Sequence, residues 1–554
     1  MSADARKKKI ALLSNVTGEL VAARLRSKYD FYLPEGFDTW MQQVLDPNSG
    51  LEREAPDAVI LLLDGTESRA WRNEGEARER LSLWKQGAEA LCDRVRETPV
   101  FLSTLDLRMN RILAYAEASC ALPLEAEWFA FLRDLMARHP NVYLLDLADR
   151  IADLGQSRFY SDKMWYLSSM PYSREGLALV SREIDRALQA AFTPRKKLIA
   201  LDLDNTLWGG VVGEDGVDGI ELSDHKEGQR FYDFQRQLLE MKNRGVVLAV
   251  NSKNNPEDAE AAIQKHPAML LRDEDFALRK INWDNKAANL KAMSRELNLT
   301  LGGFVFVDDN PVEREVVSGE CGEVLVPEFP ADTSTLLTFA EELWFDHFRP
   351  LRVLREDLEK TDMYRQEALR RQEESQSLNL DDYISRLEMR VDIHRMRPEE
   401  LERVAQLHGK TNQFNLTTRR YTQAEISAMA ADPAKRVYVA RSADKYGDNG
   451  LIAVMILVPE GEDIRIDSFL MSCRVMGRKL EDAMVDAAAC RFPGARRLLG
   501  EYLPTAKNAP VKELYDRLGF TLLREEDGRK RYALPLEGYT RKDFSLFKEL
   551  TIED

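Results

Sequence analysis

The residues best suited to chemistry lie where an apolar strand meets a pair of carboxylates, in the stretch Leu198–Leu207. Four apolar residues precede Asp202 and Asp204, which is typical of a buried parallel strand whose end opens into a site. Two carboxylates one residue apart repel each other unless a cation neutralises them, and oxygen ligands suit Mg²⁺. The stretch therefore indicates a divalent-cation site at the end of a strand.

Three later segments supply the other groups that such a site needs. A second buried strand ends in the hydroxyl of Ser252, and Lys286 follows further along the chain. A third apolar strand leads into the adjacent carboxylates Asp308 and Asp309. A hydroxyl, a cation and further carboxylates are together the groups that handle a phosphoryl group.

In this order and spacing the segments resemble the haloacid-dehalogenase (HAD) superfamily. The resemblance implies that Asp202 is the nucleophile and a metal ligand, while Asp204 is the general acid/base and also reaches Mg²⁺ through its backbone carbonyl. Ser252 would hydrogen-bond phosphoryl oxygens, and Lys286 would neutralise charge on Asp202 and on the phosphate. The implied Mg²⁺ ligands are Asp202, Asp204, Asp308 and Asp309.

Composition and charge narrow the class of protein. The 554 residues favour three or four domains, and 94 acidic against 78 basic residues disfavour a general nucleic-acid binder. Five cysteines without paired CxxC spacing indicate neither a zinc site nor a disulfide framework. The sequence shows no signal-peptide pattern and no apolar run of membrane-spanning length, so we expect a cytoplasmic protein without a membrane partner.

Alternating strand and helix patterns predict an α/β multidomain chain. Residues 1–192 predict a three-layer domain with a parallel sheet, and residues 196–345 predict a HAD Rossmann-like core. Residues 346–385 predict an exposed helical linker, and residues 386–554 a further domain. The strands expected in the first domain are Lys9–Leu13, Ala58–Leu63, Val100–Leu102 and Val142–Leu145.

The first domain resembles SGNH-type hydrolases. Ser14 occupies the place of their nucleophile in the turn after the first strand, but Trp165 stands where their general base would follow Asp162. His139 is the domain's only histidine and precedes a proline in an expected loop. Without an imidazole Ser14 has no activator, so we expect a scaffold or docking domain rather than a hydrolase.

A glycine-rich segment over 208–219 separates Asp204 from the next helix and strand. Glycines at this density predict a small hairpin flap over the site. The amphipathic pattern over 231–244 predicts a helix that covers the sheet. No insertion is long enough to form a large lid, so the site could admit a substrate carried on another protein.

The last domain contains a strand, an Arg-x-x-Gly-x-Lys turn over 474–479 and a helix that begins at Leu480. This layout suits phosphate binding by backbone N–H groups at a helix N-terminus. The turn resembles the acyl-CoA-binding turn of GNAT-type acyltransferases, although Lys479 stands where those proteins have glycine or alanine. The late segment 506–520 also matches the closing helix and strand of that fold.

Two further stretches narrow the resemblance: 410–415 reads Lys-Thr-Asn-Gln-Phe-Asn and 472–478 reads Ser-Cys-Arg-Val-Met-Gly-Arg. Together with the SGNH-like domain and Asp-Leu-Asp-Asn-Thr over 202–206, they make nearly the whole chain similar to the FkbH-like proteins of polyketide pathways, in HAD subfamily IIIC. That family takes a glyceryl unit from 1,3-bisphosphoglycerate and loads it as a thioester on an acyl carrier protein. The resemblance implies this donor and a phosphopantetheinylated carrier as partners.

The chemistry of thioester formation restricts the role of Asp202. If Asp202 attacked phosphorus, the product would be free glycerate and its activation would be lost. Sulfur must instead attack the acyl carbon while phosphate departs, which leaves open whether Asp202 is a nucleophile or only a metal ligand. The sulfur is either the carrier's thiol or Cys473, whose pKa a nearby helix N-terminus would lower. The alternative for Cys473 is simple packing as a small buried residue.

Two histidines, a set of candidate binding residues and two alternative functions are also expected from the sequence. His394 and His408 are available as bases, or have structural roles. An alternative function is a Mg²⁺-dependent HAD phosphatase acting on a small phosphorylated metabolite. A third is a non-catalytic protein that docks carrier proteins. The residues assigned to substrate or carrier binding are Asn254, Asn412, Arg474, Arg478 and Lys507.

Overall fold

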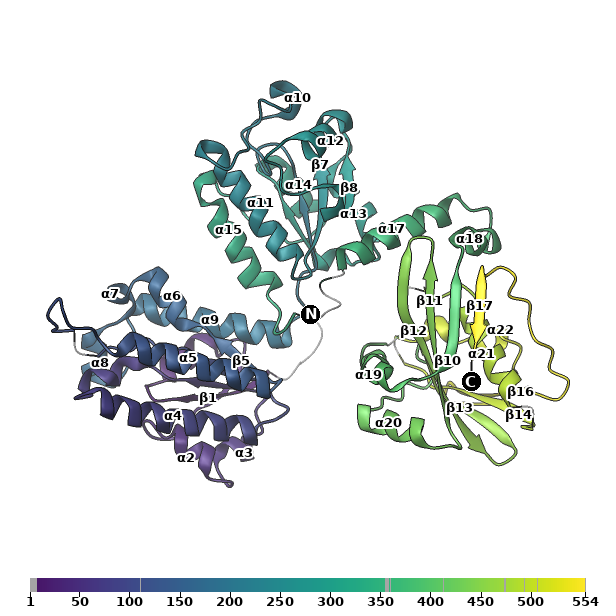
Figure 1. Ribbon diagram of the computed structural model, residues 1–554, viewed down its shortest axis with the longest axis horizontal. Helices are drawn as coiled ribbons and strands as arrows, with labels where there is room; N and C mark the ends of the chain where they lie inside the picture. The colour runs from purple at the N-terminus through teal and green to yellow at the C-terminus, as the bar shows by residue number, and fades with distance from the viewer. Residues whose placement is uncertain are drawn as a thin grey trace.

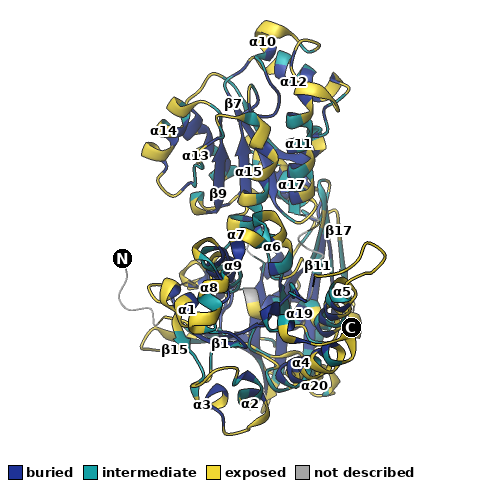
Figure 2. Ribbon diagram, turned by 90° about the vertical axis from the view of Figure 1, so that its left-hand side faces the viewer, coloured by how far each residue is buried: buried dark blue, intermediate teal, exposed yellow. Residues whose placement is uncertain are grey.

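The computed structural model contains three bodies, each built on one β-sheet (Figure 1). The residues that it describes are 7–109, 111–353, 358, 360–411, 413–472, 475–492, 494–505 and 507–553. The central strands are buried and the outer faces of the helices are exposed (Figure 2), whereas the edge strand over 521–526 is exposed along its length. The α/β multidomain fold class expected from the sequence is confirmed.

The first body, purple to blue in Figure 1, has a parallel sheet with the strand order β2-β1-β3-β4-β5. Successive β1 residues enter separate apolar clusters, Leu12 in one and Leu13 in the other, because side chains alternate across a strand. The four expected strands are present to within one or two residues, but the three-residue strand β2 was not expected. The strands are β1 (Lys9–Ser14), β2 (Asp30–Tyr32), β3 (Ala58–Leu62), β4 (Val100–Ser103) and β5 (Val142–Leu145).

Helices cover both faces of this sheet. Their long members carry an apolar face toward the strands; α4, for example, buries Leu81, Trp84 and Leu91. The helices are α1 (Glu19–Leu25), α2 (Trp40–Leu45), α3 (Gly50–Glu54), α4 (Glu74–Arg94), α5 (Ala121–Arg138), α6 (Leu147–Leu154), α7 (Gln156–Phe159), α8 (Asp162–Ser168) and α9 (Arg174–Phe192).

Glu67 lies in the 3₁₀ turn η1 (Gly65–Ala70) after β3 and leads to a pH-dependent prediction. Burial, followed by the charge of Asp38, raises the pKa of the Glu67 carboxyl to about 7, although Arg80 opposes the rise. The folded chain therefore keeps a proton that the unfolded chain loses at lower pH, and the stability contributed by Glu67 falls as the pH rises through about 7. We expect Glu67→Gln to stabilise the protein relative to wild type near pH 8 but not near pH 5, measured by urea unfolding.

The matched control for this prediction is Glu79→Gln. Glu79 is an exposed carboxylate on α4, so its substitution should change stability equally at both pH values. An equal effect of Glu67→Gln at both pH values would contradict the prediction.

The second body, teal in Figure 1, has a four-stranded parallel sheet with the order β8-β7-β6-β9. Consecutive β6 residues again enter two clusters, Leu198 on the face covered by α13 and α14 and Ile199 on the face covered by α11, α12 and α15. Strand β8 was not expected. The elements are β6 (Leu198–Leu201), β7 (Val247–Ser252), β8 (Phe276–Ile281), β9 (Phe304–Val307), α10 (Val212–Asp215), α11 (Gln229–Lys242), α12 (Pro256–Lys265), α13 (Lys286–Glu296), α14 (Pro311–Glu320) and α15 (Leu336–Leu343).

The third body, green to yellow in Figure 1, has a mixed sheet with the order β15-β16-β14-β13-β12-β11-β10-β17. The expected turn over 447–450 lies inside strand β12, because irregular pairing with β11 lets the strand continue through the glycines. The strands are β10 (Arg390–Arg395), β11 (Arg436–Asp444), β12 (Gly447–Glu460), β13 (Asp463–Met471), β14 (Arg497–Tyr502), β15 (Thr521–Glu526), β16 (Arg529–Pro535) and β17 (Glu549–Ile552). The helices are α18 (Leu380–Leu387), α19 (Leu401–Lys410), α20 (Gln423–Ala431), α21 (Leu480–Arg491) and α22 (Leu514–Arg517).

Helix α17 (Lys360–Gln376) joins the second body to the third (Figure 1). The sequence predicts an exposed linking helix here, but α17 contacts both bodies. Tyr364 and Ala368 pack against an apolar cluster of the second body. Arg370 pairs with Asp444 of the third body, with its side chain only 4% exposed. The expected exposure of this helix is wrong. α17 has few apolar residues, but its charged side chains form buried ion pairs that also pack it against the neighbouring bodies.

The Arg370–Asp444 pair predicts a large loss of stability on truncation. Arg370 donates to both oxygens of Asp444, over 2.7 and 3.0 Å, and the Asp444 side chain is fully buried. We expect Arg370→Met to lower the free energy of unfolding by about 3 kcal/mol, because the buried Asp444 carboxylate loses its closest counter-charge and keeps only Arg478, at 3.8 Å. The measurement is urea unfolding of the full chain.

Removing the stranded charge should recover part of this loss. The double variant Arg370→Met, Asp444→Asn is therefore expected to be more stable than Arg370→Met alone. Equal stabilities of the two variants would show that the pair is not a buried charge pair in solution.

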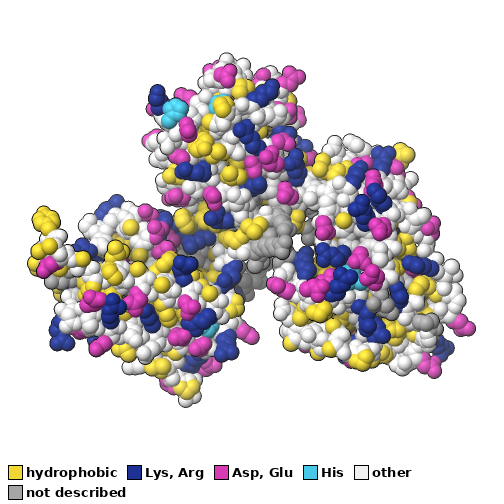
Figure 3. All heavy atoms as spheres, in the orientation of Figure 1, with side chains coloured by type: hydrophobic (Ala, Val, Ile, Leu, Met, Phe, Trp, Pro, Cys, Tyr) yellow, Lys and Arg dark blue, Asp and Glu magenta, His cyan; other side chains and the backbone are white. Residues whose placement is uncertain are grey.

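Surface properties agree with the acidic but mixed composition. Lysine and arginine side chains are interspersed with aspartate and glutamate on the face seen in Figure 3. Within the described residues no helix is both long enough and apolar enough to cross a membrane.

Candidate functional site

The carboxyl ends of three parallel strands of the second sheet carry the expected polar residues at one edge. β6 leads to Asp202, β7 ends in Ser252 and β9 leads to Asp308. β6 pairs with both β7 and β9, so its end lies about 5 Å from the end of each of these two strands. The strand order thus groups residues that are distant in the sequence.

Three carboxylates form a compact cluster at this edge. Asp202, Asp308 and Asp309 each offer one oxygen, and these oxygens lie within 4.8 Å of one another. Asp202 is 7% exposed and Asp308 is fully buried. Lys286 supplies a counter-charge, with its Nζ 2.9 Å from Asp202 Oδ1 and 2.5 Å from Asp308 Oδ2.

The cluster fits a divalent cation. Three carboxylates and one ammonium leave excess negative charge in a buried place, where like charges repel strongly. Among the described residues, Oδ1 of Asp202 is buried without a hydrogen-bond partner, although it lies within ion-pair distance of Lys286. Hard oxygen donors in this arrangement suit Mg²⁺. Asp202, Asp308 and Asp309 are therefore the residues that would hold it.

The protonation equilibria of the cluster reflect this crowding. Burial, and then the charge of Asp202, raises the pKa of Asp308 to about 6. The same two causes raise the pKa of Asp309. Burial alone would lower the pKa of Lys286, but the Asp202 and Asp308 carboxylates raise it above the ordinary lysine value. Lys286 is accordingly a fixed positive charge.

Lys286 is positioned by an asparagine network at the start of α13. Asn285 is the N-cap and accepts hydrogen bonds from the first-turn amides. Asn251 donates to the Lys286 carbonyl over 3.0 Å, and Asn289 donates to Asn251 over 3.1 Å. The network joins β7 to α13, and sequence reasoning missed both Asn251 and Asn289.

Asp204 lies beside the cluster and forms hydrogen bonds with residues of the flap. Its Oδ1 accepts hydrogen bonds from the Trp208 indole at 2.8 Å and from the Val212 amide at 3.0 Å. Its Oδ2 accepts one from Asn254 over 2.8 Å. Burial raises the pKa of Asp204, and these donors only partly offset the rise. Asn254, expected in substrate binding, thus holds Asp204 here.

The flap over 208–221 differs from a plain hairpin. Gly209 and Glu221 exchange two backbone hydrogen bonds, as expected for a hairpin, at 3.1 and 2.8 Å. The tip, however, is the helical turn α10. The Val212 amide at the start of this turn donates to Asp204, and this hydrogen bond stabilises the helical conformation of the tip.

Arg314 is a further residue that sequence reasoning missed. It is 8% exposed and donates to the carbonyls of Asp308 and Asp309, over 2.9 and 2.7 Å. The Asn310 amide also donates to Asp308 Oδ1, over 2.9 Å. An arginine in the first turn of the helix after paired aspartates was the available signal.

The residues of the third body that were assigned to carrier binding differ in their exposure to solvent. Lys507 is exposed. Arg478 is 6% exposed and lies 3.6 Å from Glu367 of α17 and 3.8 Å from Asp444, so it faces the α17 junction rather than a free phosphate site. Outside the described part of the chain lie Asn412, Cys473 and Arg474.

The two histidines offered as bases are buried. His394 lies 3.1 Å from Glu400 and 3.1 Å from Asp392. His408 packs edge-on against the Tyr421 ring at 5.5 Å, and burial lowers its pKa. Both positions are those of packed interior side chains.

Part of the Lys-Thr-Asn-Gln-Phe-Asn motif fills a gap in the third sheet. β13 and β14 pair at only two positions and then separate. The Phe414 carbonyl accepts from the Met471 amide, and Leu416 donates to the Phe469 carbonyl, over 3.1 and 3.2 Å. Leu416 also accepts from Leu503 of the segment after β14, over 2.8 Å. The chain itself therefore satisfies the backbone groups exposed by the separation.

Ser14 lies at the end of β1 and accepts a hydrogen bond from the Val16 amide over 3.1 Å. Asp162 begins α8 and pairs with Arg69 over 2.7 Å. His139 lies at the end of α5, 3.8 Å from Asp93. These contacts leave the expectation of a scaffold or docking domain as a proposal.

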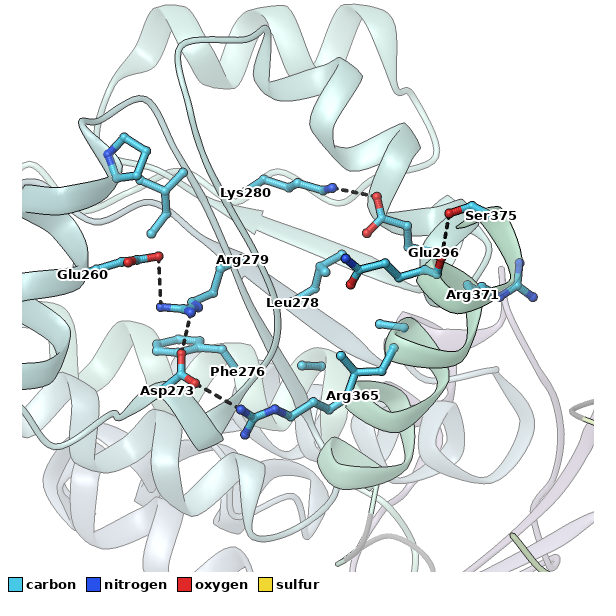
Figure 4. A pocket seen from close by; sticks show the side chains of 16 residues that line it. Glu260, Asp273, Phe276, Leu278, Arg279, Lys280, Glu296, Arg365, Arg371 and Ser375 are labelled. Atoms are coloured by element: carbon cyan, nitrogen blue, oxygen red, sulfur yellow. Dashed lines mark hydrogen bonds and ion pairs between the residues drawn. The ribbon is translucent and has the colours of Figure 1, made fainter. Parts of the chain in front are cut away.

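A cavity of about 650 Å³ lies between β8, α12 and α17, away from the carboxylate cluster (Figure 4). Its charged side chains neutralise one another. Asp273 pairs with Arg279 at 2.6 Å and with Arg365 at 3.0 Å, and Lys280 pairs with Glu296 at 2.6 Å. The cavity offers no group of convergent catalytic side chains comparable with the carboxylate cluster.

A solved structure is similar to the first two bodies of this chain. The N-terminal part of a Bacteroides fragilis protein, containing a phosphatase domain complexed with Mg, is 27% identical. The match has a TM-score of 0.56 and covers 62% of this chain and 95% of that chain.

Other comparisons add little. An acetyltransferase from Thermus thermophilus is 17% identical with a TM-score of 0.21, and covers 26% of this chain and 97% of its own. The GNAT domain of a Streptomyces lividans protein, S. lividans PAT, is 18% identical with a TM-score of 0.22, covering 26% and 89%. TM-scores this low support no argument about the third body. No family model matches the chain, and no curated protein matches it significantly. The chain is thus similar over most of its length to a protein with a Mg-bound phosphatase domain.

Proposed function

We propose that this chain is an FkbH-like enzyme that transfers a glyceryl, or related three-carbon hydroxyacyl, unit from 1,3-bisphosphoglycerate to the phosphopantetheine thiol of an acyl carrier protein. Phosphate is released, and the product serves polyketide or related secondary-metabolite biosynthesis. The observation that carries the proposal is the cluster of Asp202, Asp308, Asp309 and Lys286 at the carboxyl ends of the central strands. The likeness to a Mg-bound phosphatase domain supports phosphoryl chemistry there.

The donor carries phosphates on carbons 1 and 3, so loading a glyceryl unit takes two steps. The thiol first displaces the acyl phosphate, and water, the one further reactant, then hydrolyses the carbon-3 phosphate ester. The thiol sulfur forms a bond to the acyl carbon, and the carbon–oxygen bond to phosphate breaks with its electron pair leaving on the phosphate oxygen. The thiol proton passes to Asp204, whose carboxyl pKa is raised by burial. Lys286 and Ser252 bind the phosphate oxygens as negative charge develops on them. Mg²⁺, when bound, supplies further positive charge beside the leaving phosphate.

A second candidate is a Mg²⁺-dependent phosphatase, and the phosphatase domain of the similar structure favours it. In that reaction Asp202 would attack phosphorus, and water would then hydrolyse the phosphoaspartate. The two candidates use the same residues but break different bonds.

The bond that breaks can be read from oxygen isotopes. In ¹⁸O-enriched water a phosphatase releases phosphate that carries one oxygen from water. Thioester formation releases phosphate whose oxygens all come from the donor. The fraction of released phosphate that lacks solvent ¹⁸O, measured by mass spectrometry, therefore reports thioester formation.

The product is identified by intact-protein mass spectrometry with Mg²⁺, 1,3-bisphosphoglycerate and a phosphopantetheinylated carrier protein. We expect a glyceryl mass increment on the carrier and two released phosphates, one without solvent ¹⁸O from thioester formation and one with a single solvent ¹⁸O from hydrolysis of the carbon-3 phosphate. A glyceryl increment on the enzyme that is lost in Cys473→Ala would add a covalent relay through that cysteine. If all the released phosphate carries solvent ¹⁸O and the carrier is unmodified, the transferase is overturned and the phosphatase is supported.

A further inference from the structure

Two large apolar side chains are exposed beside the carboxylate cluster. Trp283 is 70% exposed and Val312 is 63% exposed. Among the described residues of the second body, 196–345, the third large exposed apolar side chain is Leu337 on α15, at 36%. Trp283 and Val312 thus stand out because they accompany a polar site.

The topology places these two side chains on opposite sides of that site. Trp283 follows the end of β8 by two residues, and Val312 is the second residue of α14, after β9. β8 and β9 are the outer strands of the sheet, while β7 and β6, which lead to Ser252 and Asp202, lie between them. Three strand spacings separate the outer strands, so the strand ends that lead to the two residues lie about 14 Å apart, on either side of the strand ends that lead to Ser252 and Asp202.

The backbone around Trp283 is fixed, so the exposure of its indole is part of the fold. The Asn282 amide donates to the Ser252 carbonyl over 3.1 Å. The Asn282 side chain accepts from Asn289 at 2.9 Å and from the Asp284 amide at 3.1 Å. The loop is therefore tied to β7 and to the helix that presents Lys286.

The charges at this edge select against an acidic protein surface. Exposed carboxylates lie on the flap, at Glu214 and Asp215, and next to the indole, at Asp284. The nearby Lys253 is already paired with Glu313 over 2.6 Å. An uncharged, partly aliphatic group meets the indole without repulsion, whereas a negatively charged surface does not.

We propose that Trp283 and Val312 bind the uncharged thiol-bearing arm of the acceptor, a pantetheine-class chain of amides and methyl groups, and guide its sulfur to the carboxylate edge. This inference rests on the proposed transferase function and deepens it by naming where the acceptor arm lies. The indole provides a flat apolar surface for the arm, and Val312 limits it on the other side of the carboxylate cluster.

Kinetics with free pantetheine as the thiol acceptor test the contact without a carrier protein. We expect Trp283→Ala to raise the KM for pantetheine about tenfold and Val312→Ser to raise it about threefold, as for truncated apolar binding residues. Trp283→Phe should restore most of the affinity, since an aromatic surface remains. The control Leu337→Ser should leave this KM unchanged, as should higher ionic strength with the wild type.

A binding measurement makes the test independent of turnover. The chain has eight tryptophans, so ¹⁹F NMR of protein labelled with 5-fluorotryptophan can assign Trp283 as the signal absent from Trp283→Phe. We expect pantetheine to shift this signal in the wild type and in Leu337→Ser. If a phosphopantetheinylated carrier shifts the signal but free pantetheine does not, the carrier body rather than the arm binds there, and the proposal is overturned.

The remaining outcomes separate this inference from the proposed function. Active glyceryl transfer with an unshifted Trp283 signal and an unchanged KM in Trp283→Ala overturns the arm contact alone. A pantetheine-induced shift without any transfer overturns the transferase and leaves the arm contact supported. Neither transfer nor shift overturns both.

Discussion

Asp202→Asn is expected to lower kcat/KM for glyceryl transfer by at least about a thousandfold. Asp202 is the carboxylate that the strand order places between Ser252 on one side and Asp308 on the other. Its loss removes one of three clustered oxygen ligands and one partner of Lys286. The measurement is phosphate release coupled to carrier acylation at saturating Mg²⁺.

Stability measurements distinguish loss of the site from loss of the fold. The charge of Asp202 contributes to the raised pKa values of Asp308 and Asp309, so removing it relieves repulsion. We therefore expect the metal-free Tm of Asp202→Asn to be no lower than that of wild type, and added Mg²⁺ to raise it less. The control Asp284→Asn alters an exposed carboxylate on the same edge and should retain activity. Activity within tenfold of wild type in Asp202→Asn would remove Asp202 from the reaction.

The central strands of the second sheet could be predicted because parallel strands buried on both faces are continuous apolar runs. β6, β7 and β9 have this form, and polar residues at their ends marked the site. β8 was not predicted, because it contains the charged residues Arg279 and Lys280. These are tolerated because β8 is an edge strand of the sheet. A strand's position in the sheet, which the local sequence does not record, decides whether charges are tolerated in it.

The grouping of the carboxylates with Lys286 was also predictable, since parallel strands bring their carboxyl ends to one edge. The supporting contacts were not. Asp204 is bound by Trp208, Val212 and Asn254, and this requires knowledge of how the flap folds back. Arg478 was expected to face a phosphate, but it is buried against α17 by a tertiary contact that its own turn does not reveal.

Lys286→Met is expected to destabilise the metal-free protein by about 3 kcal/mol and to abolish transfer. Lys286 is 3% exposed and pairs with Asp202 and with the fully buried Asp308. Removing its charge leaves the two buried carboxylates without a positive side chain, because neither forms an ion pair with another described lysine or arginine. Mg²⁺ bound at the same carboxylates should restore part of the lost stability, because it supplies the missing positive charge.

The pH dependence of this loss identifies its cause. In the wild type the pKa of Asp308 is already raised to about 6, so its stability contribution is present at low pH and lost as the pH rises through about 6. Lys286 opposes that rise, and the pKa of Asp308 should increase further in Lys286→Met. Below this pKa a protonated Asp308 needs no counter-charge, so the deficit of the variant should shrink between about pH 8 and about pH 5.

Lys253→Met is the matched control, because Lys253 pairs with Glu313 at 2.6 Å but is 35% exposed. A partly exposed pair contributes little, so we expect a loss of less than about 1 kcal/mol with no added dependence on Mg²⁺. Urea unfolding of both variants, with chelator and with Mg²⁺, makes the comparison. Equal losses in the two variants, or a Lys286→Met deficit that is constant with pH, would mean that the lysine does not hold the carboxylates together. A larger, pH-dependent and Mg²⁺-sensitive loss would identify Lys286 as the charge that keeps the carboxylate cluster folded before metal binds.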